Sequence, residues 1–207
     1  SRLADYLPWA ALVSAGVVLN KDGSFQRTAK FRGPDLDSAV AAELVAVAGR
    51  INNAVRRLGS GWSIFVEAQR SEAATYPDSR FPDAASALVD AERKAGFEEA
   101  DAHFVSGYFL TFLWLPPAEE AARTEAWLYE GREKTGVDPW ELMRGFIDRT
   151  DRVLALLDGF MPECRWMDDG ATLTYLHSTI STNRHRVRVP EVPMYLDALL
   201  ADQPLTG

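Results

Sequence analysis

The sequence predicts an α+β fold in which an antiparallel or mixed sheet carries helices packed on one face. Three observations predict this class. A β-hairpin pattern stands near the start of the chain, strand-like and helix-like patterns alternate after it, and no internal repeat interrupts them. Beyond the hairpin the order is strand–helix–strand, an inserted helix, then strand–helix–strand. This is the ferredoxin-like, or split βαβ, order.

The hairpin is predicted at residues 16–32, where arms at 16–20 and 24–32 flank Asp22-Gly23. Glycine tolerates the positive φ that a tight turn requires. A helix is predicted at residues 39–58, with Ser38 to cap its start and Gly59 its end. Apolar side chains recur there at steps of three and four, namely at Val40, Leu44, Val47, Ile51, Val55 and Leu58.

The middle of the chain predicts two strands around a helix. Residues 62–69 alternate between apolar and polar side chains, which is typical of a strand that is half or fully buried. A loop follows at 71–82 and a helix at 83–100. Residues 105–115 are rich in aromatic side chains, and such an apolar run predicts a central strand buried on both faces.

The last third of the chain is predicted to be mostly helical. A helix is expected to begin at Asp138-Pro139, because proline suits the first helical position. We expect one domain over residues 1–207, with a compact α+β core at 1–180 and an extended arm and terminal helix at 181–207. The predicted segments are helices at 118–130, 138–157 and 171–180, a short strand at 164–167, an exposed arm at 181–193 and a last helical turn or two at 194–200.

Composition narrows the range of functions that the chain can have. The 207 residues are 47% hydrophobic and 25% charged, which is ordinary for a globular domain. The net charge of −8 argues against nucleic acid or anionic lipid as a partner of the chain as a whole. The single cysteine, Cys164, excludes an internal disulfide and favours a reducing, cytoplasmic compartment. We find no signal peptide and no run long enough to span a bilayer, and the missing initiator methionine indicates a piece of a longer protein.

The sequence shows no recognisable catalytic apparatus. A Walker phosphate loop needs glycine followed by lysine, and none of the 14 glycines is followed by lysine. Gly59-Ser60-Gly61 is the nearest approach to a dinucleotide fingerprint, but it lies between a helix and a strand instead of opening a helix. The nucleophile motif G-x-S-x-G is absent. We therefore predict no catalytic residue, no cofactor and no metal in this chain.

Three groupings of reactive side chains also have ordinary explanations. Glu99 and His103 could share a helix face, but two ligands do not hold a metal. Cys164 beside Arg165 could be an activated thiolate, although a buried, inert thiol is the simpler interpretation. Asp168-Asp169 is predicted in a turn and is no indication of acid–base catalysis.

The most distinctive polar feature is a basic cluster, NRHRVR, at residues 183–188. Arg184, His185, Arg186 and Arg188 place a local positive patch on an acidic protein. Such a patch can bind a phosphate, a lipid headgroup or an acidic protein surface. It can equally be a solvated arm with no partner. These four residues are the candidate interaction patch.

Several segments resemble the N-terminal region of TrbE-type conjugal transfer ATPases, of the CagE/TrbE/VirB family of type IV secretion. The resemblance extends over nearly the whole chain and rests on no catalytic residue. The segments that carry it are ADYLPW at 4–9, GVVLNKDGSFQR at 16–27, FRGPDLDS at 31–38, RLGSGW at 57–62, FLTFLWLPP at 109–117 and YLDALL at 195–200.

The resemblance implies a division of labour. The parent protein would be an ATPase at the cytoplasmic base of the inner-membrane channel, with ATP, magnesium and its Walker motifs confined to a C-terminal domain. The N-terminal region would contact other secretion components, touch the inner membrane peripherally and help to arrange subunits into a ring. This chain would then be a docking domain and not an enzyme. Its contacts would include the basic cluster and an exposed edge of the hairpin that accepts a partner strand.

Two other functions stay open. A nucleic-acid-binding module is the alternative, since conjugation transfers DNA and aromatic side chains can stack on bases. The negative charge and the expected core positions of Trp62, Phe109, Phe112 and Trp114 argue against it. A stand-alone enzyme with an unfamiliar site would need a deep pocket lined by polar groups.

Overall fold

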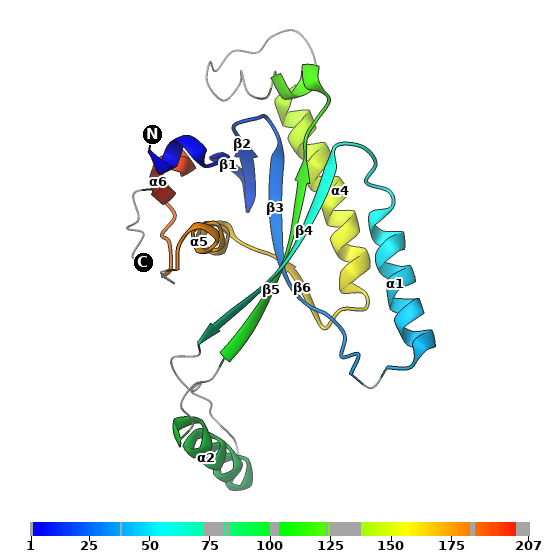
Figure 1. Ribbon diagram of the computed structural model, residues 1–207, viewed down its shortest axis with the longest axis vertical. Helices are drawn as coiled ribbons and strands as arrows, with labels where there is room; N and C mark the ends of the chain where they lie inside the picture. The colour runs from blue at the N-terminus through cyan, green and yellow to red at the C-terminus, as the bar shows by residue number, and fades with distance from the viewer. Residues whose placement is uncertain are drawn as a thin grey trace. The chain divides into compact units, whose positions relative to one another are not determined.

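Figure 1 shows the chain as a computed structural model. The structure describes residues 2–37, 39–72, 81, 83–99, 104–122, 124, 138–182 and 185–201. The chain divides into two compact units, of which the first comprises Ser1–Val66 and Phe109–Gly207 and the second Glu67–Tyr108. The boundaries between the two units fall within residues 62–72 and 104–114, which are strands.

The sheet contains six strands in the order β1-β2-β3-β5-β4, and β6 also pairs with β3. The pairs β1/β2, β2/β3 and β3/β6 are antiparallel, with Val18 opposite Gln26 and Ala29 opposite Trp166. In Figure 1 the arrow of β5 runs opposite to those of β3 and β4. The strands are β1 (Trp9–Ser14), β2 (Val17–Asn20), β3 (Phe25–Arg32), β4 (Trp62–Glu72), β5 (Phe104–Trp114) and β6 (Glu163–Trp166).

The described helices begin where the local sequence supplies a cap. The Asp138 carboxylate accepts a hydrogen bond from the Trp140 N–H at 2.9 Å, and Asp168 caps α5 in the same way. The Glu43 carboxylate accepts from the Val40 N–H at 2.9 Å at the start of α1. The helices are η1 (Leu3–Tyr6), α1 (Ala41–Val55), α2 (Ala84–Glu99), α4 (Pro139–Asp158), α5 (Asp169–Ile180) and α6 (Leu196–Ala201).

Helices cover both faces of the sheet. Val18 of β2 packs in one core with Leu173 of α5, whereas Val17 and Leu19 pack in another with Phe146 of α4. Successive strand residues point to opposite faces, so both faces are apolar and both need a cover. In Figure 1, α1 and α4 lie on one side of the sheet and α5 and α6 on the other. The α+β class is confirmed, and the prediction of helices on one face is wrong.

Aromatic rings fill the core beneath α4. Phe146 lies 5.7 Å from Phe25 and 5.5 Å from Trp62 between ring centroids, and Trp62 lies 5.8 Å from Trp114. Such pairs add about 0.5–1.5 kcal/mol each beyond the area they bury. On the opposite face Phe109 lies 4.6 Å from Tyr175 of α5. These aromatic side chains therefore belong to the core, as the sequence predicted.

Most predicted elements are confirmed within a residue or two. The hairpin is β2 and β3, and the predicted helices at 83–100 and 138–157 are α2 and α4. The sequence did not predict β1. Strand β4 extends to Glu72, so it takes the first residues of the predicted loop; residues 73–80 lie outside the described ranges. Of the helix predicted at 118–130, residues 118–122 and 124 are helical and the others lie outside the described residues.

Candidate interaction surfaces

The basic cluster is divided between a buried and an exposed side. Val187 is 5% exposed, and its N–H donates to the Thr174 hydroxyl of α5 at 3.0 Å. His185 is half-buried, whereas Arg186 and Arg188 are exposed. Arg184 lies outside the described residues. The segment predicted as an exposed arm is therefore anchored at Val187, because an apolar side chain there completes the core that α5 builds.

His185 faces a second histidine and not solvent alone. Its ring lies 4.5 Å from that of His177 between centroids, and His177 is 1% exposed. Burial lowers the pKa of His177, and the charge of His185 lowers it further. No described residue forms a hydrogen bond with Nε2 of His177. The shift favours the neutral imidazole of His177, and Arg186 and Arg188 are the exposed cations among the described residues of this patch.

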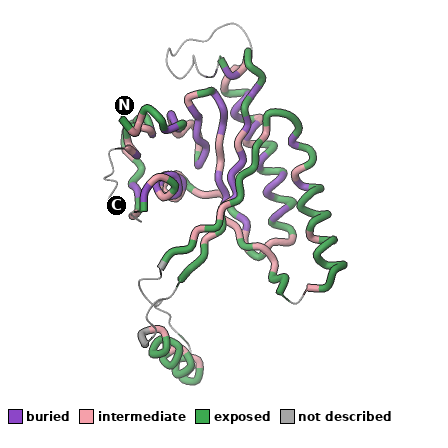
Figure 2. Tube along the Cα trace, in the orientation of Figure 1, coloured by how far each residue is buried: buried purple, intermediate pink, exposed green. Residues whose placement is uncertain are grey.

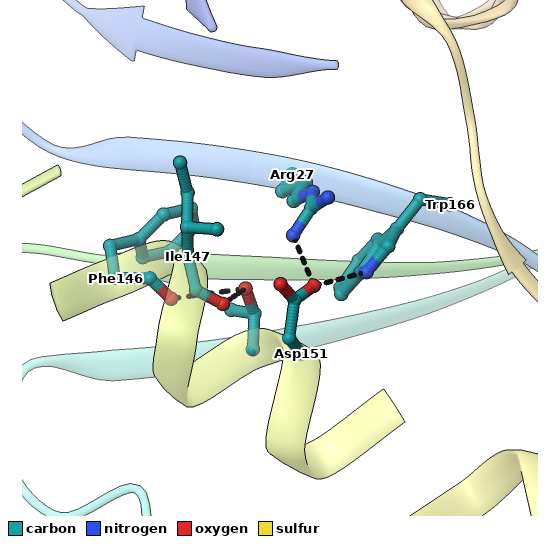
Figure 3. A network of polar contacts seen from close by, with 6 residues as sticks. Arg27, Phe146, Ile147, Asp151 and Trp166 are labelled. Atoms are coloured by element: carbon teal, nitrogen blue, oxygen red, sulfur yellow. Dashed lines mark hydrogen bonds and ion pairs between the residues drawn. The ribbon is translucent and has the colours of Figure 1, made fainter. Parts of the chain in front are cut away.

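A partly buried ion pair joins α4 to two strands. The Asp151 Oδ1 accepts hydrogen bonds from the Arg27 guanidinium of β3 and the Trp166 Nε1 of β6, each at 2.7 Å (Figure 3). The Arg27 guanidinium carbon lies 4.0 Å from the Trp166 ring centroid, a cation–π distance. Burial lowers the pKa of Arg27, and the hydrogen bond and charge of Asp151 raise it. These residues are distant in sequence, and no local pattern indicates their contact.

The exposed sheet edges are not where the sequence placed them. Strand β1 pairs with β2, and β5 and β6 pair with β3, so the predicted edge of the hairpin is covered. Strand β4 is instead a terminal strand of the order. Its Ile64, Phe65 and Val66 are 37%, 56% and 68% exposed. The prediction of a half-buried or buried strand is therefore wrong at these three residues. Among the described strands, none pairs with the outer edge of β4.

Helix α1 exposes most of its apolar surface. Ala54 is its one buried residue, while Leu44, Val45 and Ile51 are exposed, with Val45 at 71%. In Figure 2 the helix is drawn almost wholly in the colour of exposed residues. Its last turn contacts α4 through the core that contains Ala54 and Leu58. A helix that is this apolar and this exposed is unusual for an isolated domain.

A shallow hollow of about 530 Å³ lies beside β1, between that strand and the start of α6. Among the described residues that line it, none is charged, and the hydroxyl of Tyr195 is the one polar side-chain group. This lining consists of Ala11, Pro193, Met194, Tyr195 and Ala198. This is not a deep pocket with convergent polar groups, which is what an enzyme site would need.

The reactive groupings have structural explanations where the structure describes them. Cys164 is buried, and burial first and the charge of Asp158 second raise the pKa of its thiol to about 11. Asp168 caps α5, and Asp169 accepts from the Gly16 N–H at 2.7 Å. His103 lies outside the described residues. Within the described ranges no three metal-ligating side chains gather, and no described helix has the length and apolarity to cross a bilayer.

Comparison with known proteins decides the family. The model of the N-terminal domain of the type IV secretion system ATPase VirB4/TrbE matches residues 16–122, from β2 to the helical residues after β5. The chain belongs to this family. The matched residues contain no glycine followed by lysine, so they contain no Walker phosphate loop.

Two relatives agree with this membership. The chain is 34% identical over 216 residues to the conjugal transfer protein TrbE of Rhizobium radiobacter, a match that covers 95% of this chain and 26% of that relative. It is 43% identical over 126 residues to the first portion of a probable conjugal transfer protein TrbE of Sinorhizobium fredii (strain NBRC 101917 / NGR234), covering 59% of this chain and 83% of the relative. The chain thus spans about a quarter of the length of the first relative.

Proposed function

We propose that this chain is a non-catalytic assembly domain of a conjugal transfer ATPase, which docks onto other secretion components at the inner membrane. ATP and magnesium would bind in the remainder of the parent protein. Family membership and the quarter-length match to a TrbE relative support this division. The chain's own contribution would be binding surfaces and not chemistry.

The exposed apolar face of α1 carries this proposal. Hiding an exposed valine or leucine side chain from water is worth about 1.5–3 kcal/mol, so a helix that leaves Leu44, Val45 and Ile51 exposed is suited to binding a partner. Monomeric proteins rarely leave such contiguous patches open. The carboxylate of Glu43 and the guanidinium of Arg50 supply charges beside the patch that can orient the partner.

The basic cluster supplies a second contact in this proposal. Arg186 and Arg188 are exposed and flank the buried Val187, so a rigid anchor holds two cations on an acidic protein. An acidic protein segment or an anionic headgroup matches that chemistry. The contribution of Arg184 stays a prediction.

We also propose that the segment of the chain from β3 to β6 has the ferredoxin-like order. Strands β3 and β4, which α1 connects, lie on either side of β5, and β6 pairs with β3. Helices α1 and α4 contact each other, as the two helices of a split βαβ fold do. Strands β1 and β2 and helix α2 lie outside that order. The proposal explains why α1 is placed at the surface of the unit.

Conjugation in donor cells tests the docking function. Val45→Glu in the full-length protein should lower the transfer frequency at least about tenfold, because a carboxylate in an apolar interface costs several kcal/mol. Asn53→Glu adds the same charge at an exposed polar position of the same helix and should transfer normally. Protein abundance and the ATPase rate of the purified full-length protein should be unchanged in both. Normal transfer by Val45→Glu would refute docking through α1.

A further inference from the structure

Strand β4 has the features of an interface strand. It is 11 residues long, it ends the sheet order, and three consecutive apolar side chains are exposed on it. An unpaired edge presents N–H and C=O groups that can pair with another strand. The exposed triplet Ile64, Phe65 and Val66 adds apolar side chains on both faces of that edge.

The first half of β4 lacks the charges that usually protect an edge strand from pairing. Natural edge strands are blunted by charged side chains or proline, and residues 62–66 contain neither; the charges of β4 follow at Glu67, Arg70 and Glu72. The one basic residue is Arg70, whose guanidinium carbon lies 4.2 Å from the ring centroid of Phe104 on β5. The edge around Phe65 is therefore left open to pairing.

We propose that β4 pairs antiparallel with β4 of a second copy of the chain, with the two-fold axis at Phe65. In this register Phe65 lies opposite Phe65 of the second copy, and Ile64 lies opposite its Val66. Beyond the apolar centre, Ser63 meets a Glu67 carboxylate and the large Trp62 meets the small Ala68. The segment Ser63–Glu67 is thus nearly palindromic in side-chain character, which is what an isologous interface requires.

The neighbouring registers pair the apolar triplet less well. An axis at Ile64 places Phe65 opposite the polar Ser63, an axis at Val66 places Phe65 opposite Glu67, and an axis at Glu67 places two carboxylates directly opposite each other. Cross-strand pairs differ by about 0.2–1 kcal/mol each, and like charges that face each other destabilise the pairing. The apolar triplet therefore selects the axis at Phe65.

The dimer is expected to be weak and closed. A single strand edge hides less surface than the roughly 1,200 Å² of a stable interface, which indicates micromolar affinity. Two copies with a net charge of −8 each repel one another, so added salt should strengthen the association. An isologous contact is complete with two copies, so it differs from the ring contacts implied for the parent protein. It goes beyond the proposed docking function, because it needs no other secretion component.

Sedimentation equilibrium of the 207-residue chain tests the affinity. Between about 5 and 200 µM we expect a monomer–dimer equilibrium that about 0.5 M NaCl shifts toward dimer. Val66→Lys should weaken dimerisation at least about tenfold, and this side chain is exposed enough for the monomer to fold normally. Val45→Lys is the matched control on α1 and should dimerise like the unaltered chain. A monomer at all concentrations, or a dimer unaffected by Val66→Lys, overturns the proposal.

Disulfide trapping tests the register. With Cys164→Ser to remove the native thiol, Phe65→Cys should form a covalent dimer under mild oxidation, since the two side chains face each other across the axis. Ala68→Cys should not, because two copies of residue 68 would be about 20 Å apart at about 3.4 Å per residue. Trapping through residue 68 and not 65 contradicts the register. A chain that stays monomeric while Val45→Glu still blocks conjugation would overturn this inference and leave the docking function intact.

Discussion

Removing the Asp151 carboxylate should measurably destabilise the first unit. In Asp151→Ala, the guanidinium of Arg27 and the indole N–H of Trp166 both lose their acceptor. A hydrogen bond to a charged group contributes about 1.5–3 kcal/mol and a neutral one about 1 kcal/mol. The Asp151 side chain is 50% exposed, so water replaces part of what is lost. We expect the free energy of unfolding to fall by about 2 kcal/mol.

Urea denaturation followed by tryptophan fluorescence measures this loss. With a slope of about 2 kcal/mol per molar urea, the midpoint should move by about 1 M. Arg165→Met is the control, because the Arg165–Glu163 pair is similarly close at 3.0 Å but Arg165 is 69% exposed. An exposed pair of this kind contributes about 0–1 kcal/mol. Its midpoint should therefore barely move.

A double-mutant cycle identifies which donor causes the loss. Arg27→Met removes the largely buried charge that needs Asp151, so the double variant Arg27→Met/Asp151→Ala should lose less than the sum of the single variants, by about 1 kcal/mol. Trp166→Phe removes the indole donor and keeps an aromatic ring, and it should couple more weakly. Strictly additive losses for Arg27 and Asp151, or a loss below about 0.5 kcal/mol for Asp151→Ala, would refute the argument that burial of Arg27 makes this pair matter.

Two further predictions concern the backbone and a buried histidine. Gly59 and Gly61 have nearly the same φ, 80° and 81°. A Cβ added at Gly61 would lie 2.4 Å from the carbonyl oxygen of Leu115, whereas a Cβ added at Gly59 would have no neighbour within 4 Å. Gly59→Ala should cost about 1–2 kcal/mol in urea and Gly61→Ala at least about 2 kcal/mol more, and equal costs would contradict the predicted clash. Folding lowers the pKa of His177 below its ordinary 6.5. The contribution of the neutral His177 to stability is therefore complete above pH 6.5 and is lost as the pH falls below 6.5. The difference in unfolding free energy between the unaltered chain and His177→Gln should therefore narrow from about pH 7 to about pH 5, and a constant difference would show that His177 does not titrate on unfolding.

Local patterns in the sequence predicted the elements that local physics determines. Asp22-Gly23 marked the β2–β3 turn and Asp138-Pro139 marked the start of α4, because turns and caps depend on a few adjacent residues. Strand β1 was missed because Trp9–Ser14 is nearly continuously apolar and shows no alternation. The sequence does contain a signal for helices on both faces of the sheet, since the apolar run of β2 indicates a strand that is buried on both sides.

The sequence did not predict the candidate surfaces, because the exposure of an apolar face depends on whether another element of the chain packs against it. Periodicity placed Leu44 and Ile51 on one apolar helix face, and alternation assigned Ile64 to a strand that is half or fully buried. Both patterns report that a face is apolar, and neither reports whether this chain contains the partner that covers it. The basic cluster failed in the opposite way. Val187 stands among polar residues in the sequence, so its burial was not predicted. Its N–H donates to the hydroxyl of Thr174, and its side chain packs in the core that α5 helps to form.

The exposed apolar residues of α1 and β4 have different partners for a geometric reason. A helix face offers side chains alone, so it needs a surface of complementary shape, and the mixed polar flanks of α1 give a second copy no special advantage. A strand edge offers backbone groups that any extended segment satisfies, so the side chains need only avoid conflict, and Ser63–Glu67 avoids conflict with itself. Self-pairing is therefore the simplest use of β4, while α1 is left for a different protein. The variants Val45→Glu and Val66→Lys separate the two uses, since each changes one surface and leaves the other intact.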